Sequence, residues 1–239
     1  MTLQGKRVVL LGGTSGIGLA TARAAAKAGA TLVVASSSQA RVDAALQQLP
    51  AGTTGHAVDL TQEQSFRDLF EKVGAFDHLT FTAGENLQLS TIAGSDVAAA
   101  RRFFELRYWG AFMAAKYGSG RIRAGGSIVF TGGSAFARPQ SGWAVAASIC
   151  GAMEGLTRAL AVELAPIRVN LVAPGVVRTE LWGGMSEADR EGLFRAFGAK
   201  LLVGRVGQAD EIGDAYVYLM SNGFMTGQVV DIDGGSSLV

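Results

Sequence analysis

Short apolar runs alternate with longer helical patterns along nearly the whole chain. The run Arg7–Leu11 has the length and content of a buried strand, and the alanine-rich stretch Ile17–Ala28 after it predicts a helix that Gly29 ends. A second apolar run, Thr31–Ala35, follows directly. This order of strand, turn, helix and strand predicts a βαβ unit with parallel strands and a right-handed crossover.

The alternation continues to the end of the chain. Further helices are expected at Gln39–Gln48, Gln62–Val73, Asp96–Tyr117, Ala144–Glu163, Glu187–Ala199 and Ala209–Met220. Further strands are expected at Gly55–Val58, His78–Thr82, Ser127–Thr131, Arg168–Ala173 and Val229–Ile232. Short apolar strands between long helices predict an α/β fold, a Rossmann-type doubly wound parallel sheet in three α/β/α layers. Because no repeat or linker divides the sequence, we expect a single domain over residues 1–239, in which residues 182–202 form either a lid or a surface insertion.

Composition and charge exclude several kinds of partner. The 21 basic and 20 acidic residues are scattered, so the sequence predicts no surface for nucleic acid or for a membrane. Cys150 is the only cysteine and His56 and His78 are far apart, so neither an intrachain disulfide nor a metal site is expected. The apolar run after Lys6 is too short for a signal peptide or a membrane span, and we expect a cytoplasmic protein.

A glycine-rich turn, GGTSGIG, joins the first predicted strand to the first helix. Glycines in this place allow the backbone to approach a ligand closely, and the free N–H groups at the start of a helix favour a pyrophosphate. The turn alone would also fit a structural role. In this strand-to-helix context we expect a dinucleotide to bind at Gly12, Thr14, Ser15, Gly16, Ile17 and Gly18.

Several spaced motifs resemble those of the short-chain dehydrogenase/reductase family. Leu11–Gly18 has the spacing of the family's TGxxxGxG, with leucine in place of the threonine. Asp77–Gly84, DHLTFTAG, is similar to D-x-L-V-N-N-A-G, and Arg168–Thr179, RVNLVAPGVVRT, is similar to R-V-N-x-(I/V)-x-P-G-x-V-x-T. Gly204–Ala215 and Thr226–Gly235 resemble the family's closing segment. Agreement in order over nearly the whole chain identifies it as a member of this family and implies an oxidoreductase that uses a nicotinamide dinucleotide.

The resemblance also implies which residues hold the rest of the cofactor. Asp59 and Leu60 would flank the adenine, and Ala83 and Gly84 the adenosine ribose. The nicotinamide half would lie against Pro174, Gly175, Val177 and Thr179. Taken singly, Asp59 would also fit a helix cap, and the proline and glycine would fit an ordinary turn.

The end of the second strand bears on the choice of dinucleotide. Enzymes that prefer NAD commonly carry an acidic residue there, which binds the ribose 2′-OH. Here the place is taken by Ser36, followed by Ser37 and Ser38. Without a carboxylate, the hydroxyls and Arg41 would accept a 2′-phosphate, so NADP(H) is favoured over NAD(H). The alternative is a solvated loop from which Arg41 points outward.

The four side chains that describe the family's active site, Asn, Ser, Tyr and Lys, are all replaced. The text GLTRALAVEL at Gly155–Leu164 matches the family and sets the helix register, which puts Ala146 at the tyrosine and Cys150 at the lysine. The family's serine aligns with Gly133, and Ser134 follows one place later. The family's asparagine aligns with Arg107, which directly precedes Tyr108.

Other groups would have to supply the lost chemistry. General acid–base catalysis contributes on the order of 10²–10⁴ in rate, whereas positioning of two reactants contributes roughly 7–11 kcal/mol, so hydride transfer remains feasible. Ser134 and Tyr108 are the candidate proton donors, and Arg107 is a candidate to polarise a carbonyl. Each of these residues also fits a structural role: Ser134 as a turn hydroxyl, Tyr108 in helix packing and Arg107 in an ion pair. Trp109 and Trp143 would line a substrate pocket or belong to the core.

Three functions fit these residues. The first is an NAD(P)(H)-dependent oxidoreductase with a non-standard active site, acting on a carbonyl or alcohol of a small molecule. The second is a dinucleotide-binding protein without redox turnover, a sensor or a partner subunit. A lyase or isomerase is the third, although no group of residues argues for it.

The resemblance also implies a homodimer or homotetramer formed through the helices at Asp96–Tyr117 and Ala144–Glu163. Both helices carry apolar residues on more than one face, as expected when a second face is buried. Phe103, Phe104, Met113 and Met153 are among them. A large monomer core would explain the same pattern.

Overall fold

The protein has a seven-stranded parallel sheet at its centre. The computed structural model describes residues 1–86 and 89–239. The strand order is β3-β2-β1-β4-β5-β6-β9, which confirms the expected doubly wound sheet. The strands are β1 Arg7–Leu11, β2 Thr31–Ser36, β3 Thr54–Ala57, β4 Phe76–Phe81, β5 Ile122–Thr131, β6 Arg168–Pro174 and β9 Val229–Ile232. Two further strands, β7 Val177–Arg178 and β8 Gly207–Gln208, pair beside it.

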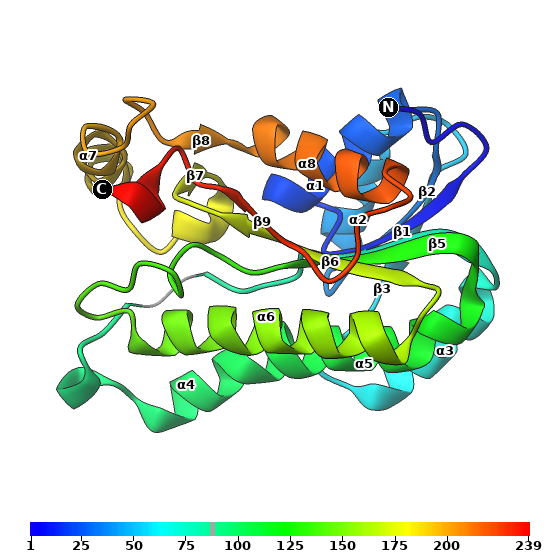
Figure 1. Ribbon diagram of the computed structural model, residues 1–239, viewed down its shortest axis with the longest axis horizontal. Coiled ribbons are helices and arrows are strands. Elements are labelled where there is room, and N and C mark those ends of the chain that lie inside the picture. Colours follow the sequence, from blue (N-terminus) through cyan, green and yellow to red (C-terminus); the bar gives the residue numbers. More distant parts are fainter. Residues whose placement is uncertain (87–88) are drawn as a thin grey trace.

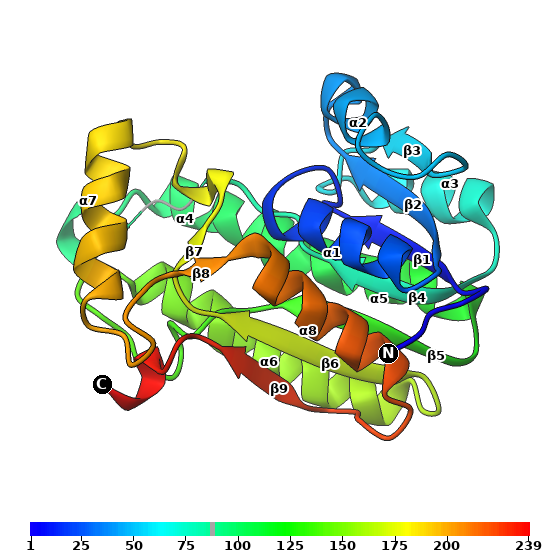
Figure 2. The same cartoon turned by 90° about the horizontal axis from the view of Figure 1, so that it is seen from above.

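Helices cover both faces of the sheet (Figure 1). One face carries α1 Gly16–Lys27, α2 Gln39–Leu46 and α8 Ala209–Ser221. The other carries α3 Glu63–Val73, α4 Val97–Phe104, α5 Gly110–Gly118 and α6 Ala144–Glu163. The remaining helix, α7 Glu187–Gly198, stands apart from both layers, at the end of the molecule where the C-terminus lies (Figures 1 and 2).

The alternation of side chains along β1 explains the two helical layers. Successive residues of a strand point to opposite faces, so Val8 and Leu10 enter the core beneath α1 and α8. Val9 and Leu11 enter the core beneath α3, α5 and α6. All four side chains are fully buried. A strand that is buried on both faces therefore reads as a continuous apolar run, which is the pattern that predicts it.

The expected helix Asp96–Tyr117 is interrupted. A π-helical turn at Glu105–Trp109 separates α4 from α5, and the N–H of Gly110 donates to the carbonyl of Glu105, five residues earlier. Gly110 lies against the sheet, where a Cβ would come within 3.0 Å of the Phe81 ring. The extra residue in this turn changes which side chains face the carboxyl end of the sheet, and π turns often occur at functional sites.

The carboxyl ends of the parallel strands lie at one end of the molecule, together with β7, α7 and the C-terminus (Figure 2). The strand order reverses between β1 and β4, and ligands of open α/β sheets bind outside the carboxyl ends of strands at such a reversal. The fold therefore places the loops after β1, β4, β5 and β6 around one region.

Candidate functional site

The glycine-rich turn after β1 packs tightly against the end of β4. A Cβ on Gly18 would lie 2.0 Å from the carbonyl oxygen of Gly12 and 2.5 Å from Thr82 Oγ1. Gly12 has a φ of 92°, and a Cβ there would lie 2.5 Å from the backbone nitrogen of Ala83. Only glycine fits these positions, because any Cβ would clash with neighbouring backbone. The glycines therefore leave a cradle of uncovered backbone between the turn and the end of β4.

The same turn meets the segment that follows β7. A Cβ on Gly16 would lie 3.3 Å from Glu180 Oε2 and 3.4 Å from Thr179 Cβ. The helix α1 starts here, and the Ser15 side chain does not cap it. The N–H groups of its first turn thus face the region enclosed by three predicted cofactor segments, at Gly12–Gly18, Ala83 and Thr179.

The adenosine end of the predicted site is formed by the ends of β2 and β3. Ser36 is buried, whereas Arg41 lies exposed in the first turn of α2, whose N-cap Ser38 accepts the Arg41 N–H. Asp59 is exposed and its Oδ1 accepts hydrogen bonds from the N–H and hydroxyl of Thr61, whereas Leu60 is buried. The Asp59 carboxylate thus stabilises its own turn. Ser37 is exposed.

The segment expected to hold the nicotinamide half adjoins the loop after β5. The N–H of Ser134 donates to the carbonyl of Pro174 over 3.0 Å, and the N–H of Gly175 donates to Ile232 over 3.0 Å. Val177 is buried and its carbonyl accepts from the Trp182 indole. These bonds fix the loops after β5 and β6 against each other.

Two positions that the sequence aligns with the family's serine and lysine lie close together. A Cβ on Gly133 would lie 3.1 Å from Cys150 Sγ, so the two residues are neighbours. Cys150 is half-buried, and burial raises the pKa of its thiol to about 11. At neutral pH the thiol is therefore protonated and a poor nucleophile. The positive charge of Arg107 opposes this shift of the thiol pKa with a smaller effect than burial.

Arg107 is held over the end of β4 by a partner that the sequence motifs do not include. Its Nη2 donates to the carbonyl of Glu85 over 2.5 Å, and its Nε lies 3.7 Å from Glu85 Oε2. Gly84 leaves room for it, because a Cβ there would lie 2.6 Å from the guanidinium carbon. Glu85 directly follows the DHLTFTAG motif, but only the fold reveals that its carboxylate faces Arg107.

The two predicted proton donors lie in different surroundings. Ser134 lines a cavity of about 430 Å³ beside the loop after β5, together with Trp143 and Phe197, whose rings stack with centroids 6.1 Å apart. Tyr108 packs edge-on against Trp109, with ring centroids 5.1 Å apart, and belongs to the margin of the core. The cavity thus brings together Ser134 and Trp143, and Tyr108 is absent from its lining.

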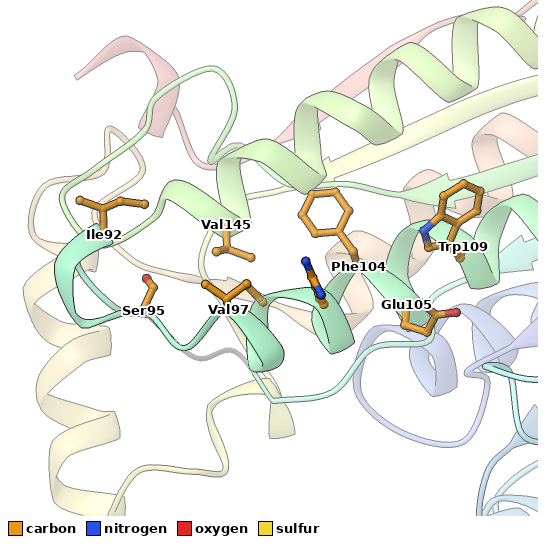
Figure 3. A pocket seen from close by; sticks show the side chains of 9 residues that line it. Ile92, Ser95, Val97, Phe104, Glu105, Trp109 and Val145 are labelled. Atoms are coloured by element: carbon orange, nitrogen blue, oxygen red, sulfur yellow. The ribbon is translucent and has the colours of Figure 1, made fainter.

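A second hollow lies on the helical face between α4 and the start of α6 (Figure 3). Val145 at the start of α6 faces Val97 at the start of α4, and Phe104 and Trp109 line the hollow further along (Figure 3). Its volume is about 530 Å³ and its lining is mainly apolar. None of the predicted cofactor or catalytic residues lines it, so it is distinct from the site at the strand ends.

Comparison with known proteins agrees with the geometry. A family model for an SDR-like Rossmann domain, where SDR denotes short-chain dehydrogenase/reductase, matches residues 2–239. The chain belongs to the short-chain dehydrogenase/reductase family. It is 37% identical to the short-chain dehydrogenase/reductase ATR9 of Stachybotrys chlorohalonatus over 99% of both chains.

Two solved structures resemble this SDR protein over nearly their whole length. A small-chain dehydrogenase in complex with NADPH superposes with a TM-score of 0.84 at 36% identity, over 98% of this chain and 99% of that one. The MalC Reductase/Diels-Alderase of Malbranchea aurantiaca superposes with a TM-score of 0.90 at 30% identity, over 98% and 96%. The relatives are named dehydrogenases and reductases, which supports an SDR oxidoreductase.

Proposed function

We propose that this SDR protein is an NADP(H)-dependent oxidoreductase that interconverts a carbonyl and an alcohol of a small molecule through a non-standard active site. The observation that carries the proposal is the Arg107 guanidinium, which lies over Gly84 after β4 and stands at the position that the sequence aligns with the family's asparagine. A binding protein would need no cation there. A cation at this place can stabilise the negative charge that develops on a carbonyl oxygen.

The residues that would hold the dinucleotide fit it. Gly12 and Gly18 leave a cradle that a Cβ would fill, and the start of α1 at Gly16 offers N–H groups to the diphosphate. Pro174 and Thr179 would position the nicotinamide half from the segment after β6. A nicotinamide dinucleotide supplies hydride chemistry when it is bound.

Preference for NADP(H) rests on the end of β2. No carboxylate stands at Ser36 or Ser37, and Arg41 is exposed beside them in α2. A guanidinium and hydroxyls suit a 2′-phosphate, whereas a carboxylate would repel it. The structural neighbour that contains NADPH supports the same preference.

The substrate would enter the cavity beside Ser134, Trp143 and Phe197. Its volume of about 430 Å³ is within the range for small-molecule sites, and two aromatic rings give it an apolar wall. The N–H of Ser134 donates to Pro174, so this cavity adjoins the segment expected to hold the nicotinamide. A hydride donor and a carbonyl could therefore meet at its inner end.

Binding without redox turnover is the second candidate. It is favoured by Ala146 and Cys150 at the tyrosine and lysine positions, since neither side chain is a proton donor or acceptor suited to neutral pH.

Fluorescence titration with NADPH and NADH tests the cofactor. We expect NADPH to bind at least tenfold tighter, and Arg41→Ala to remove most of this difference, because a hydrogen bond to a charged group contributes about 1.5–3 kcal/mol. Ser36→Asp should favour NADH. Tighter binding of NADH by the wild type would contradict the preference.

The cradle itself is tested by Gly18→Ala, with Gly120→Ala as the matched control. Gly18 has no space for a methyl group, whereas nothing lies within 4 Å of a Cβ on Gly120. We expect only the first variant to lose NADPH binding. Turnover is then measured as NADPH oxidation with a set of carbonyl compounds, for the wild type and for Ser134→Ala and Tyr108→Phe. A wild type that binds NADPH and oxidises it with none of them would favour the second candidate.

A further inference from the structure

Glu85 and Arg107 form a charged pair at the carboxyl end of β4 that the fold holds firmly. Arg107 lies in the π turn between α4 and α5, and its guanidinium stacks on Phe103, with the guanidinium carbon 4.4 Å from the ring centre. Its Nη2 donates to the Glu85 carbonyl. The missing Cβ of Gly84 provides the space that the guanidinium occupies. Two contacts and the space above Gly84 thus fix the cation in one place.

The two charged groups do not satisfy each other. Arg107 Nε and Glu85 Oε2 are 3.7 Å apart, beyond hydrogen-bonding distance. Within residues 1–86 and 89–239, both atoms are buried and neither has a hydrogen-bond partner. A buried polar atom without a partner costs about 1–3 kcal/mol, more when it is charged. A hydroxyl to one side of the pair, within hydrogen-bonding distance of each atom, would satisfy both.

The environment also suits proton transfer. Burial raises the pKa of the Glu85 carboxyl above its ordinary value, and Arg107 opposes this with a smaller effect. Burial lowers the pKa of Arg107, which still remains a cation at neutral pH. The pair therefore combines a permanent cation with a carboxyl group whose pKa is moved towards neutrality, as a general acid requires.

We propose that Glu85 and Arg107 together bind the substrate oxygen, and that Glu85 exchanges the proton with it, in place of the tyrosine that the chain lacks. This inference rests on the proposed function, because it assigns the acid of that reaction. The two facing atoms are themselves buried, but the rest of each side chain is partly exposed, by 39% for Glu85 and 21% for Arg107, and a ligand would reach the pair from that side. The ligand chemistry is that of a ketone or aldehyde oxygen, or of the corresponding alcohol.

The step balances. In reduction, the carbon of the C=O group receives the hydride, and the electron pair of the π bond moves to the oxygen. The O–H bond of the Glu85 carboxyl breaks, its proton forms the new O–H bond of the alcohol, and Glu85 becomes a carboxylate beside Arg107. Water then returns a proton to Glu85. Oxidation of the alcohol follows the reverse path, with the Glu85 carboxylate as the base.

The test compares Glu85→Gln with the matched control Glu71→Gln, an exposed residue of α3. In the substrate set used above, we expect Glu85→Gln to lower kcat/KM by roughly 10²–10⁴. NADPH affinity in fluorescence titration should change less than threefold, because Glu85 acts on the substrate. Glu71→Gln should change neither quantity.

The pH profile gives a second kinetic readout. Carbonyl reduction by the wild type should be fastest at low pH and fall as the pH rises through the pKa of Glu85, because the acid form is needed. This fall should be absent from the residual activity of Glu85→Gln. Among the residues that the structure describes, Arg107 is the charged side chain that acts on this carboxyl, and Cys150 acts in turn on Arg107. Cys150→Ala should leave the profile in place.

Carbon-13 NMR of glutamate-labelled protein gives a readout without turnover. One carboxyl resonance should titrate above the ordinary glutamate range, vanish in Glu85→Gln and move still higher in Arg107→Gln, because the neighbouring cation is lost. Turnover that Glu85→Gln preserves within threefold, or the lack of such a resonance, would overturn this inference alone. A wild type that binds NADPH without any turnover would overturn the proposed function as well.

Discussion

His78 is a titratable residue that lies inside the sheet, away from the proposed chemistry. Its side chain is 3% exposed, its Nδ1 lies 2.9 Å from Ser127 Oγ, and burial with the charge of Arg168 lowers its pKa to about 4. The folded protein therefore holds a neutral imidazole over a pH range in which the unfolded chain takes up a proton. Folding and protonation of His78 are coupled over this range.

As the pH falls from 6.5 to 4, protonation of His78 in the unfolded chain should lower the free energy of unfolding by roughly 3 kcal/mol. Protonation of carboxylates adds its own effect at lower pH. Above pH 6.5 both states are neutral at this residue, and below pH 4 both are protonated, so its contribution changes only between these values. Urea unfolding at several pH values measures it. His78→Gln should flatten the curve in this range, and His56→Gln, at the other, half-buried histidine, should retain most of the slope. An equal slope in the wild type and His78→Gln would contradict the assignment.

Individual residues of the candidate site were predictable to different degrees. Gly12 and Gly18 could be found because a backbone approach of this kind requires glycine, and glycine is visible in a sequence. Glu85 could not be found. Its role depends on burial and on a π turn that brings Arg107 over Gly84, and no local pattern reports either. Gly133 and Cys150, which the register of α6 aligns with the family's serine and lysine, are neighbours in the fold.

Among the elements, α7 packs on the rest of the molecule through a small separate hydrophobic cluster of Trp182, Phe194, Leu201 and Val206, and through polar and aromatic contacts. Arg178 forms a two-bond ion pair with Glu191, with distances of 2.5 and 3.0 Å, and stacks on Phe194. One turn after Phe194, near the C-terminal end of α7, Phe197 stacks on Trp143 at the start of α6. The second contact also forms the wall of the cavity beside Ser134, so a movement of α7 would open that cavity.

Phe197→Ala should loosen the C-terminal half of α7. Losing the ring contact costs about 0.5–1.5 kcal/mol beyond the lost burial, so amide hydrogen exchange over residues 187–198 should speed up roughly tenfold. Mass spectrometry of deuterated peptides measures this change. Arg195→Ala, an exposed change in the same helix, should leave the exchange rate within twofold. An unchanged rate in Phe197→Ala would favour a fixed insertion over a lid for residues 182–202.

The length of an element decided how well the sequence predicted it. The bounds of β1, β9 and α6 were predicted without error, since each has a continuous apolar pattern with clear ends. The strands β7 and β8 were missed because two-residue strands carry no period. The break between α4 and α5 was missed because its apolar spacing continues across the π turn, whereas the extra residue is fixed by packing of Gly110 on the sheet.

At the scale of the whole molecule, the helical face with α4 and α6 is incompletely covered. By length and composition α6 is apolar enough to span a membrane, a property that core helices of soluble proteins share. Only 28% of its most apolar stretch is buried within the single chain. Beside it, Ile92, Val97 and Trp109 expose 81%, 65% and 47% of their surfaces around the hollow of Figure 3. A net charge of +1 offers little repulsion between copies. A second copy of the chain that pairs the same helices would bury this face.

Static light scattering of the purified protein should therefore give the mass of a dimer or a tetramer. The double change Val97→Glu with Trp109→Glu should reduce this mass to that of a monomer, because two carboxylates on each copy would be desolvated and face one another in the interface. Both residues are exposed in the single chain, so the variant should fold and keep its far-UV circular dichroism. Phe224→Glu changes a side chain that is 99% exposed outside this face and should keep the wild-type mass. A monomeric wild type, or a double variant of unchanged mass, would show that this face has another role.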